Sequence, residues 1–252
     1  MNTAKPRLIM VLLALTTNLA WAVDATIQPY GTVGTPAISG NGGYAAPLDI
    51  EIASILHRIN LAEKGDRPCL VQARYWFERS TNDQPPELET SGDNAWANTC
   101  NGSLTSGTGA LRSPANNKAA AIPGRVEPDS DGARRAAVGV AVCLNGKRTR
   151  VKGIRIYGAK IEANGQIVRE SALNDDFQRT NCKTPWASAS MCGNLRVVTG
   201  LDLQFSKPLG NSKNELVGIG VRCQRVRAEN FRAPTATMQR GSLRQVQPST
   251  SN

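Results

Sequence analysis

The sequence predicts a mostly antiparallel, disulfide-bonded all-β fold with one short N-terminal helix. Apolar and polar residues alternate at 154–157 and 201–205, turn-forming residues separate the apolar segments, and the number of cysteines is even. Alternation with a period of two gives a strand one buried and one solvated face, which is typical of antiparallel sheets. We therefore expect the core to consist of strands.

The first 22 residues have the order of a secretory signal peptide. Lys5 and Arg7 precede an apolar segment at 8–19, and Ala20-Trp21-Ala22 supplies small residues before the cleavage point. The apolar segment is shorter than the ~20 residues that a membrane-spanning helix needs. We expect cleavage near Ala22, a secreted or periplasmic destination, and no transmembrane segment.

The chain is basic, with 30 Lys and Arg against 20 Asp and Glu. Removing the signal peptide takes away two basic residues, which leaves a net charge of +8. Outside the cytoplasm, this charge favours acidic glycans or other anionic surface polymers as partners, and no nucleic acid is expected. The alternative is that the charge serves only solubility.

Residues 23–47 have no periodic apolar pattern and are expected to form an extended lead-in to a domain at 48–228. Apolar residues recur at intervals of three and four over 48–61, which predicts one amphipathic helix. The polar segment at 229–252 is expected to be a disordered tail.

Five segments carry strand patterns: 69–77, 138–144, 151–161, 197–205 and 216–226. Loops are expected at 80–92 and 100–136, where Asn, Ser, Gly, Pro and Asp dominate. Asn145-Gly146 predicts a tight hairpin turn, because both residues tolerate a positive φ.

The six cysteines are Cys69, Cys100, Cys143, Cys182, Cys192 and Cys223. An even number in an exported chain predicts three disulfides, for which 15 connectivities are possible. The chain also contains an apparent repeat, in which Trp-Ala and a cysteine precede a Val-Gly-aliphatic segment that ends in a second cysteine. Its copies are 96–143 and 186–223, and a related phrase without the cysteine lies at 151–156. If the repeat is real, the simplest pairing is Cys100 with Cys143, Cys192 with Cys223, and Cys69 with Cys182.

Within residues 182–226, Trp186-Ala187-Ser188, Cys192-Gly193, Gly200-Leu201-Asp202-Leu203 and the segment 216–223 resemble a repeat of the vitelline membrane outer layer protein family. That family has a tryptophan, a cysteine followed by glycine, a Gly-x-x-Leu strand, and an aliphatic strand ending in Arg-x-Cys or a close relative. The resemblance implies a β-prism, in which three Greek-key sheets surround a pseudo-threefold axis, and oligosaccharide binding without enzyme activity. An irregular β-sandwich is the alternative fold.

Aromatic and basic side chains are the candidates for ligand binding. Those expected to stack on sugars or bond their hydroxyl groups are Trp96, Trp186, Tyr157 and Arg155. Those expected to bind an anionic polymer are Lys147, Arg148, Arg150 and Lys152. The alternatives are that the tryptophans fill the core and that the basic cluster protects an edge strand from aggregation.

The sequence assigns no catalytic residue, cofactor or metal. His57 is the only histidine and lies in the predicted helix, away from any Gly-x-Ser-x-Gly motif. Asp175-Asp176 and Glu87 with Glu89 are carboxylate pairs of the kind a glycosidase requires, but solvated loop acids are the alternative. Asp129-Ser130-Asp131-Gly132 begins like a calcium loop and lacks its later ligands.

These observations together predict a non-enzymatic exported binding module for a glycan or another anionic surface polymer. An exported effector or inhibitor that binds another protein is the second interpretation, and a secreted hydrolase is the third.

Overall fold

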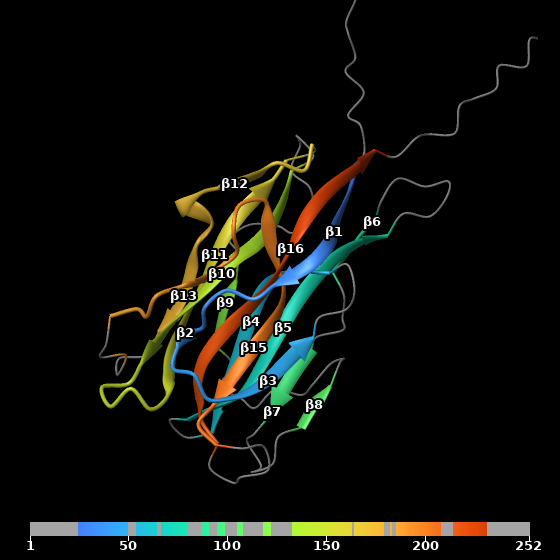
Figure 1. Ribbon diagram of the computed structural model, residues 1–252. Helices are drawn as coiled ribbons and strands as arrows, with labels where there is room; N and C mark the ends of the chain where they lie inside the picture. Colours follow the sequence, from blue (N-terminus) through green and yellow to red (C-terminus); the bar gives the residue numbers. More distant parts are fainter. Residues whose placement is uncertain are drawn as a thin grey trace, which may run out of the picture.

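The structure is a computed structural model, and it describes residues 25–49, 54–64, 67–79, 87–90, 95–98, 105–107, 118–121, 133–162, 164–178, 182, 185–207 and 214–230. Strands make up almost all of its regular structure (Figure 1). Over these ranges there is no α-helix, only a 3-10 turn at Ser171–Leu173. No helix in the described part is long and apolar enough to cross a membrane. The all-β prediction is confirmed.

The helix predicted over 48–61 is wrong, because β4 (Ile55–Lys64) occupies most of the described part of this segment. The pairing of β4 with its neighbour shifts at His57, which is an extra residue without a register partner. This bulge places Leu56 and Ile59, three residues apart, in the same buried cluster. A bulged strand thus imitates the apolar spacing of a helix.

The strands form three antiparallel sheets. Sheet A has the order β1 (Ala25–Gly34), β16 (Leu216–Asn230), β15 (Arg196–Phe205) and β3 (Tyr44–Asp49), with β2 (Ser39–Gly40) beside β16. Sheet B has the order β8 (Thr105–Gly107), β7 (Ala95–Asn98), β5 (Arg67–Arg79), β4 and β9 (Lys118–Ala121), with β6 (Glu87–Thr90) beside β5. Sheet C has the order β12 (Ile167–Arg169), β11 (Val151–Ile161), β10 (Arg134–Leu144) and β14 (Ser190–Met191), with β13 (Asp175–Gln178) beside β11.

Each sheet is centred on one long hairpin, and the three hairpins share the same register. They pair β4 with β5, β10 with β11, and β15 with β16, and each has five residue pairs between two bulges. The extra residues of the first bulge are His57, Val138 and Thr199, and those of the second are Cys69, Lys152 and Val217. Bulges bend a strand and increase its twist. Three equivalent bent hairpins around a common core make this fold a β-prism.

The hairpin register shows that the repeat predicted from the sequence is misaligned. Residues 138–143 lie on β10, the first strand of its hairpin, whereas 217–223 lie on β16, the second strand of its hairpin. The segment equivalent to 216–221 is instead 151–156, the phrase that lacks a cysteine. The third copy of the hairpin is formed by β4 and β5.

The structure describes two disulfides, Cys143–Cys182 and Cys192–Cys223, with Cα separations of 5.8 and 5.6 Å. The second confirms the prediction. The first disulfide contradicts the predicted pairing, because Cys143 does not pair with Cys100 and Cys182 does not pair with Cys69. Cys69 is also disulfide-bonded, whereas Cys100 lies outside the described residues. The error follows from the repeat, which treated two strands at different positions in their hairpins as equivalent.

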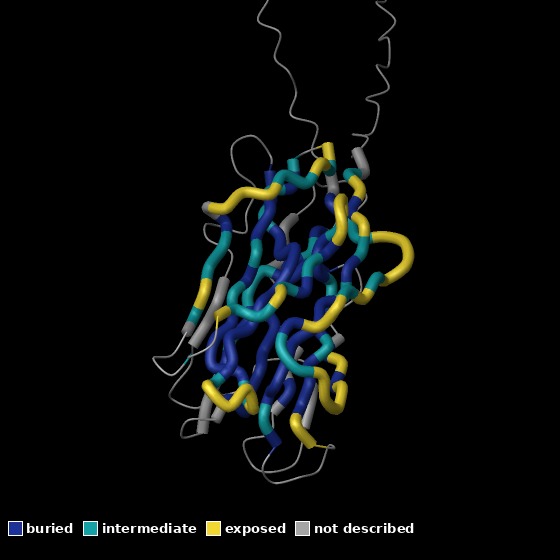
Figure 2. The backbone as a smooth tube through the Cα atoms, turned by 60° about the vertical axis from the view of Figure 1, so that its left-hand side comes forward, coloured by how far each residue is buried: buried dark blue, intermediate teal, exposed yellow. Residues whose placement is uncertain are grey.

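Apolar residues from all three sheets share the main core. Leu61, Val142 and Leu203, which occupy equivalent places in the three hairpins, are all buried in it. A second cluster around Trp76 contains residues from the same three sheets. The Trp76 indole is fully buried, and its Nε1 donates a hydrogen bond to the carbonyl of Arg135 at 2.7 Å. Figure 2 shows the buried backbone along the middle of the molecule, with exposed segments around it.

Two buried serines connect sheet A to sheet C. The Ser39 hydroxyl accepts the N–H of Val142 at 2.9 Å, and the Ser190 hydroxyl accepts the N–H of Val221 at 3.2 Å. A buried backbone amide without an acceptor is costly, so these bonds hold the two sheets at a defined offset.

Residues 25–47, the described part of the predicted lead-in, belong to the domain and do not merely lead into it. β1 and β2 pair with β16, and Ile27 is fully buried. The segments predicted as loops also contain the short strands β6, β8 and β9, and β10 already begins at Arg134. The predicted signal peptide lies outside the described residues, as does the predicted tail after Asn230.

We expect stability to fall on acidification partly because of His57. Burial, then Arg74 and Arg58, lower the pKa of its imidazole from 6.5 to about 4. The unfolded chain therefore binds this proton first, so the contribution of neutral His57 is present above pH 6.5 and lost as the pH falls towards 4. Between pH 7 and 4 the wild type should lose about 3 kcal/mol more of its unfolding free energy than His57→Gln. Urea denaturation of both proteins across this range is the measurement.

Glu78 changes the pH dependence of stability in the opposite direction, because burial raises the pKa of its carboxyl and the folded state therefore binds this proton first as the pH falls. The His57 contribution is therefore read from the difference between the two proteins and not from the wild type alone. Parallel pH profiles of stability would contradict the prediction.

Candidate functional site

The loop between β10 and β11, residues 145–150, carries part of the predicted basic patch. The connection is longer than the tight turn expected at Asn145-Gly146. Asn145 Oδ1 accepts the N–H of Thr149 at 2.7 Å, and Arg148 takes the positive φ of 55°. Asn145 therefore shapes the loop through its side chain and not through a left-handed backbone.

Only the tip of this loop projects into solvent. Lys147 and Arg148 are exposed there. Arg150 forms an ion pair with Glu215 at 3.5 Å, and Lys152 is the second-bulge residue, only 1% exposed. Lys152 is therefore not part of an exposed basic patch, because its bulge position turns the side chain towards the interior.

Trp186 and Arg155 meet at sheet C. The guanidinium carbon of Arg155 lies 4.4 Å from the centre of the Trp186 ring, a cation–π contact. The same guanidinium donates two hydrogen bonds to Asp176 Oδ2, at 2.5 and 3.1 Å. These bonds raise the pKa of Arg155 above its ordinary value. Because Arg155 covers one face of Trp186, a sugar ring must displace it to stack on that face.

Tyr157 extends this group on β11. With Arg155, Asn174, Asp175 and Asp176 it lines a depression of about 330 Å³. The structure thus brings three of the candidate binding residues together. Trp96 lies on β7 of sheet B, and its side chain is outside the described part of the chain.

The carboxylate pairs considered for glycoside cleavage lie on different sheets. Asp175 and Asp176 are on β13 of sheet C, whereas Glu87 and Glu89 are on β6 of sheet B. His57 is on β4 of sheet B. Among the residues that the structure describes, no group of three His, Cys, Asp or Glu side chains could hold a metal ion.

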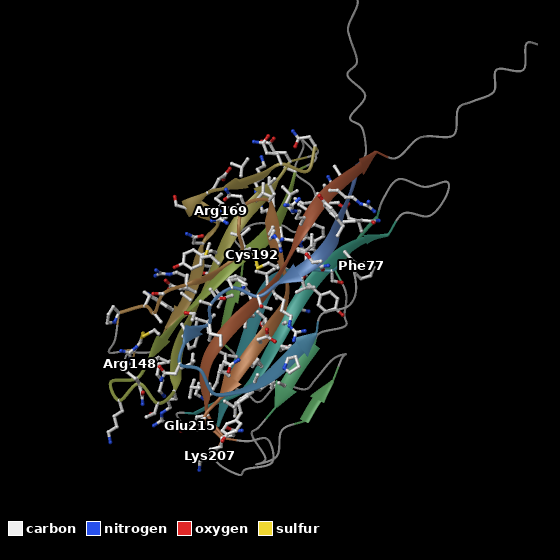
Figure 3. The ribbon with its side chains drawn as sticks, in the orientation of Figure 1. Phe77, Arg148, Arg169, Cys192, Lys207 and Glu215 are labelled. Atoms are coloured by element: carbon white, nitrogen blue, oxygen red, sulfur yellow. A yellow bond between two sulfur atoms is a disulfide. The ribbon has the colours of Figure 1, made fainter. Side chains whose placement is uncertain are left out.

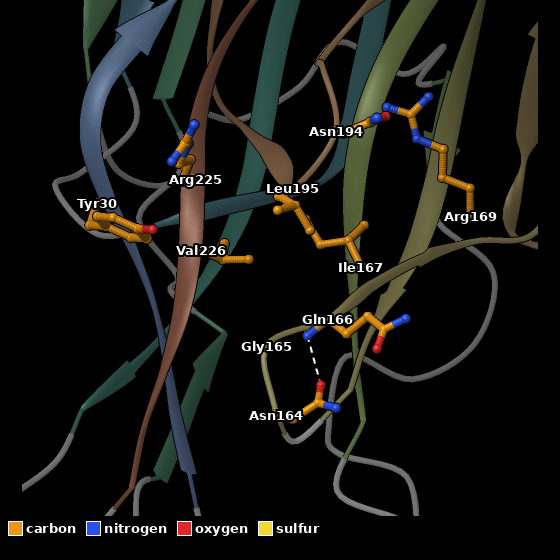
Figure 4. A pocket seen from close by; sticks show the side chains of 10 residues that line it. All are labelled: Tyr30, Asn164, Gly165, Gln166, Ile167, Arg169, Asn194, Leu195, Arg225 and Val226. Atoms are coloured by element: carbon orange, nitrogen blue, oxygen red, sulfur yellow. Dashed lines mark hydrogen bonds between the residues drawn. The ribbon is translucent and has the colours of Figure 1, made fainter.

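A depression of about 780 Å³, which we call the end groove, lies where sheets A and C meet (Figure 4). Two of its apolar residues, Val226 and Ile167, belong to or pack against the cluster around Trp76. The end groove is lined by Tyr30, Asn164, Gly165, Gln166, Ile167, Arg169, Asn194, Leu195, Arg225 and Val226.

Several distant chain segments supply these residues. Tyr30 on β1 and Arg225 on β16 are register partners. The turn between β11 and β12 supplies 164–166, where Gly165 has a φ of 83° and Asn164 Oδ1 accepts the N–H of Gln166 at 2.8 Å, the dashed line in Figure 4. The loop before β15 supplies 194–195, and the Cys192–Cys223 disulfide joins this loop to β16. The groove therefore depends on tertiary contacts between sheets.

The end groove is basic. Arg169 Nη2 donates to the carbonyls of Cys192 and Gly193, at 2.5 and 3.4 Å. Carbonyls carry no net charge, so these bonds fix the guanidinium without neutralising it. Arg225 is exposed on the opposite wall. Since no Asp or Glu of the described residues lines the groove, its potential favours an anionic ligand.

Solved lectin structures overlap with this chain. The agglutinin of Calystegia sepium does so at 10% identity and a TM-score of 0.39, covering 78% of this chain and 98% of the lectin. A mannose-binding lectin from Champedak overlaps with it at 12% identity and a TM-score of 0.36, covering 78% of this chain and 96% of the lectin. The V. cholerae biofilm matrix protein Bap1 also overlaps with this chain, at 10% identity and a TM-score of 0.35, covering 81% of this chain and 27% of Bap1. Overlaps of this size carry no weight for the function of this chain.

No protein-family model matches the chain, and no curated protein matches it either. The resemblance to the vitelline membrane outer layer family therefore stays a prediction. The β-prism that it implied is present in the sheets themselves.

The candidate residues predicted from the sequence do not include any that line the end groove. Asn164-Gly165 is a turn-forming pair in the sequence, but such a pair indicates a turn and not a groove. Tyr30 and Arg225 are almost two hundred positions apart and become neighbours only through the pairing of β1 with β16. No local pattern could have indicated this groove.

Proposed function

We propose that this chain is an exported, non-enzymatic glycan-binding module whose ligand occupies the end groove. The lining of the groove carries the proposal. Tyr30, Ile167 and Leu195 offer apolar surface for the C–H face of a sugar ring, and neighbouring amide side chains can bond its hydroxyl groups. Open, shallow sites with mixed apolar and amide surface suit hydrated ligands such as oligosaccharides.

The charge of the groove favours acidic sugars over neutral ones. Arg169 and Arg225 stand on its two walls, and a guanidinium can bind a carboxylate through two parallel hydrogen bonds. Glycoside cleavage requires two carboxyl groups beside the scissile bond, and the described lining of the groove holds none. The proposal is therefore binding without turnover.

Export is part of the proposal. The order of residues 1–22 supports it, as do the disulfides, which persist mainly in oxidising compartments. An anionic surface polymer would be the natural ligand class there.

We expect Arg225→Ala to weaken binding of acidic oligosaccharides by about 10-fold or more, because it removes a charged hydrogen-bond donor from one wall. The exported protein, expected to begin at Val23, is screened on an array of neutral and acidic oligosaccharides. Titration calorimetry of the variant with the best acidic tetrasaccharide then measures the loss.

Lys207→Ala is the matched control. Lys207 is an exposed cation that does not line the groove, so its loss tests the effect of net charge alone. Failure to bind any glycan, or equal losses in the two variants, would remove the basis of the proposal.

A further inference from the structure

Three smaller depressions follow sheet C from the end groove to the basic loop. Their volumes are about 130, 330 and 300 Å³. Arg169 lines both the end groove and the first of them, and Tyr157 and Asn174 line both the first and the second. Arg155 of the second is stacked on Trp186 of the third, which Arg148 also lines. We call this series the sheet C furrow.

The furrow is long enough for several linked sugar rings. Arg169 lies opposite Ala159 in the strand register, and Arg148 lies in the loop just before β11 begins at Val151. From Val151 to Ala159 the strand rises about 27 Å, at ~3.4 Å per residue. Figure 3 shows Arg169 and Arg148 at opposite ends of the same flank of the molecule.

Charge is distributed unevenly along the furrow. Arg169 lies at one end with Glu170 beside it, and Lys147 and Arg148 are exposed at or beside the other end. The middle contains Asp175 and Asp176, of which Asp176 binds Arg155. Carboxylates in the middle accept hydrogen bonds from sugar hydroxyls and repel anionic groups. A bound chain should therefore be charged at intervals and not at every sugar.

Resting on the function proposed above, we infer that the furrow extends the end groove into a site for a continuous stretch of polysaccharide, in which neutral sugars separate uronic acids. The end groove holds one part of the chain, Tyr157 and Asn174 contact its middle, and Arg148 meets an anionic group beyond Trp186. A ligand of two to four sugars occupies only part of this path.

The test is the dependence of affinity on chain length. Titration calorimetry measures hyaluronan oligosaccharides, which alternate glucuronic acid with N-acetylglucosamine, at four and ten sugars. Fully charged oligogalacturonates of the same two lengths are measured in parallel. We expect the ten-sugar hyaluronan to bind at least 10-fold more tightly than the four-sugar one, and more tightly than the ten-sugar oligogalacturonate.

Variants separate the two ends of the path. Arg148→Ala should weaken only the ten-sugar ligand, whereas Arg225→Ala should weaken both lengths, and Lys207→Ala should change neither. Equal affinity at both lengths, or an Arg148→Ala variant that binds the long ligand normally, would overturn the furrow while leaving the end groove intact. Tighter binding of oligogalacturonate would overturn the spaced-charge pattern. Binding of no oligosaccharide would instead overturn the proposed function itself.

Discussion

Replacing Glu78 with alanine is expected to lower the free energy of unfolding by about 3–5 kcal/mol. Glu78 on β5 is buried, its Oε1 accepts from Arg134 Nε, and its Oε2 accepts the N–H of Ile27 at 2.5 Å. These three residues belong to sheets B, C and A, so one carboxylate links all three sheets. Its loss leaves a buried guanidinium and a buried amide without this acceptor. Urea denaturation measures the change.

Two further variants identify the cause of that loss. Glu78→Gln keeps an oxygen acceptor and removes the charge, so its cost should be smaller than that of alanine. Removing both charges, in Glu78→Leu with Arg134→Leu, should restore much of the stability, because an apolar pair of similar volume avoids the desolvation of two ions. A cost below about 1 kcal/mol for Glu78→Ala would show that the buried pair does not hold the sheets together.

Removing the Cys192–Cys223 disulfide should cost about 4 kcal/mol and also weaken glycan binding. The two cysteines are 31 positions apart, and closing a loop of that length restricts the unfolded chain by about this amount. The bond also joins β16, which carries Arg225, to the loop that carries Asn194 and Leu195. Thermal unfolding and tetrasaccharide titration of the Cys192→Ala, Cys223→Ala double variant measure the two effects.

The Cys143–Cys182 disulfide provides the control. Its cysteines are 39 positions apart, so the corresponding double alanine variant should lose a similar amount of stability. Neither residue lines the end groove, so tetrasaccharide affinity below the unfolding temperature should stay within about 2-fold of the wild type. Equal losses of affinity in the two double variants would show that the Cys192–Cys223 disulfide has no specific effect on the end groove and acts on stability alone.

The sequence predicted correctly what depends on neighbouring residues. The five strand segments at 69–77, 138–144, 151–161, 197–205 and 216–226 all lie within strands of the structure. Each was recognisable because alternate side chains of a strand point to opposite faces, a relation that holds within a few residues. The pairing of Cys192 with Cys223 was also predicted, although the repeat used to derive it is misaligned.

The errors arose where a residue's environment depends on a partner strand. His57 disturbs the alternation of β4 because no residue of β5 is its register partner. The apolar spacing of the segment then resembles that of a helix. Lys152 looks like part of an exposed basic cluster, but it is buried at the second bulge of its hairpin, on β11. A bulge is a property of two paired strands, so one strand's sequence does not reveal it.

By itself, the sequence of this protein determined five of the strands, the fold class, the basic charge and the even number of cysteines. Only the tertiary structure decided the threefold register of the hairpins, the pairing of Cys143 with Cys182 and the existence of the end groove. The physical reason is that alternation is written into each strand by its own side chains. The groove, in contrast, forms where Tyr30, 164–166, 194–195 and Arg225 are brought together by sheet pairing across most of the chain.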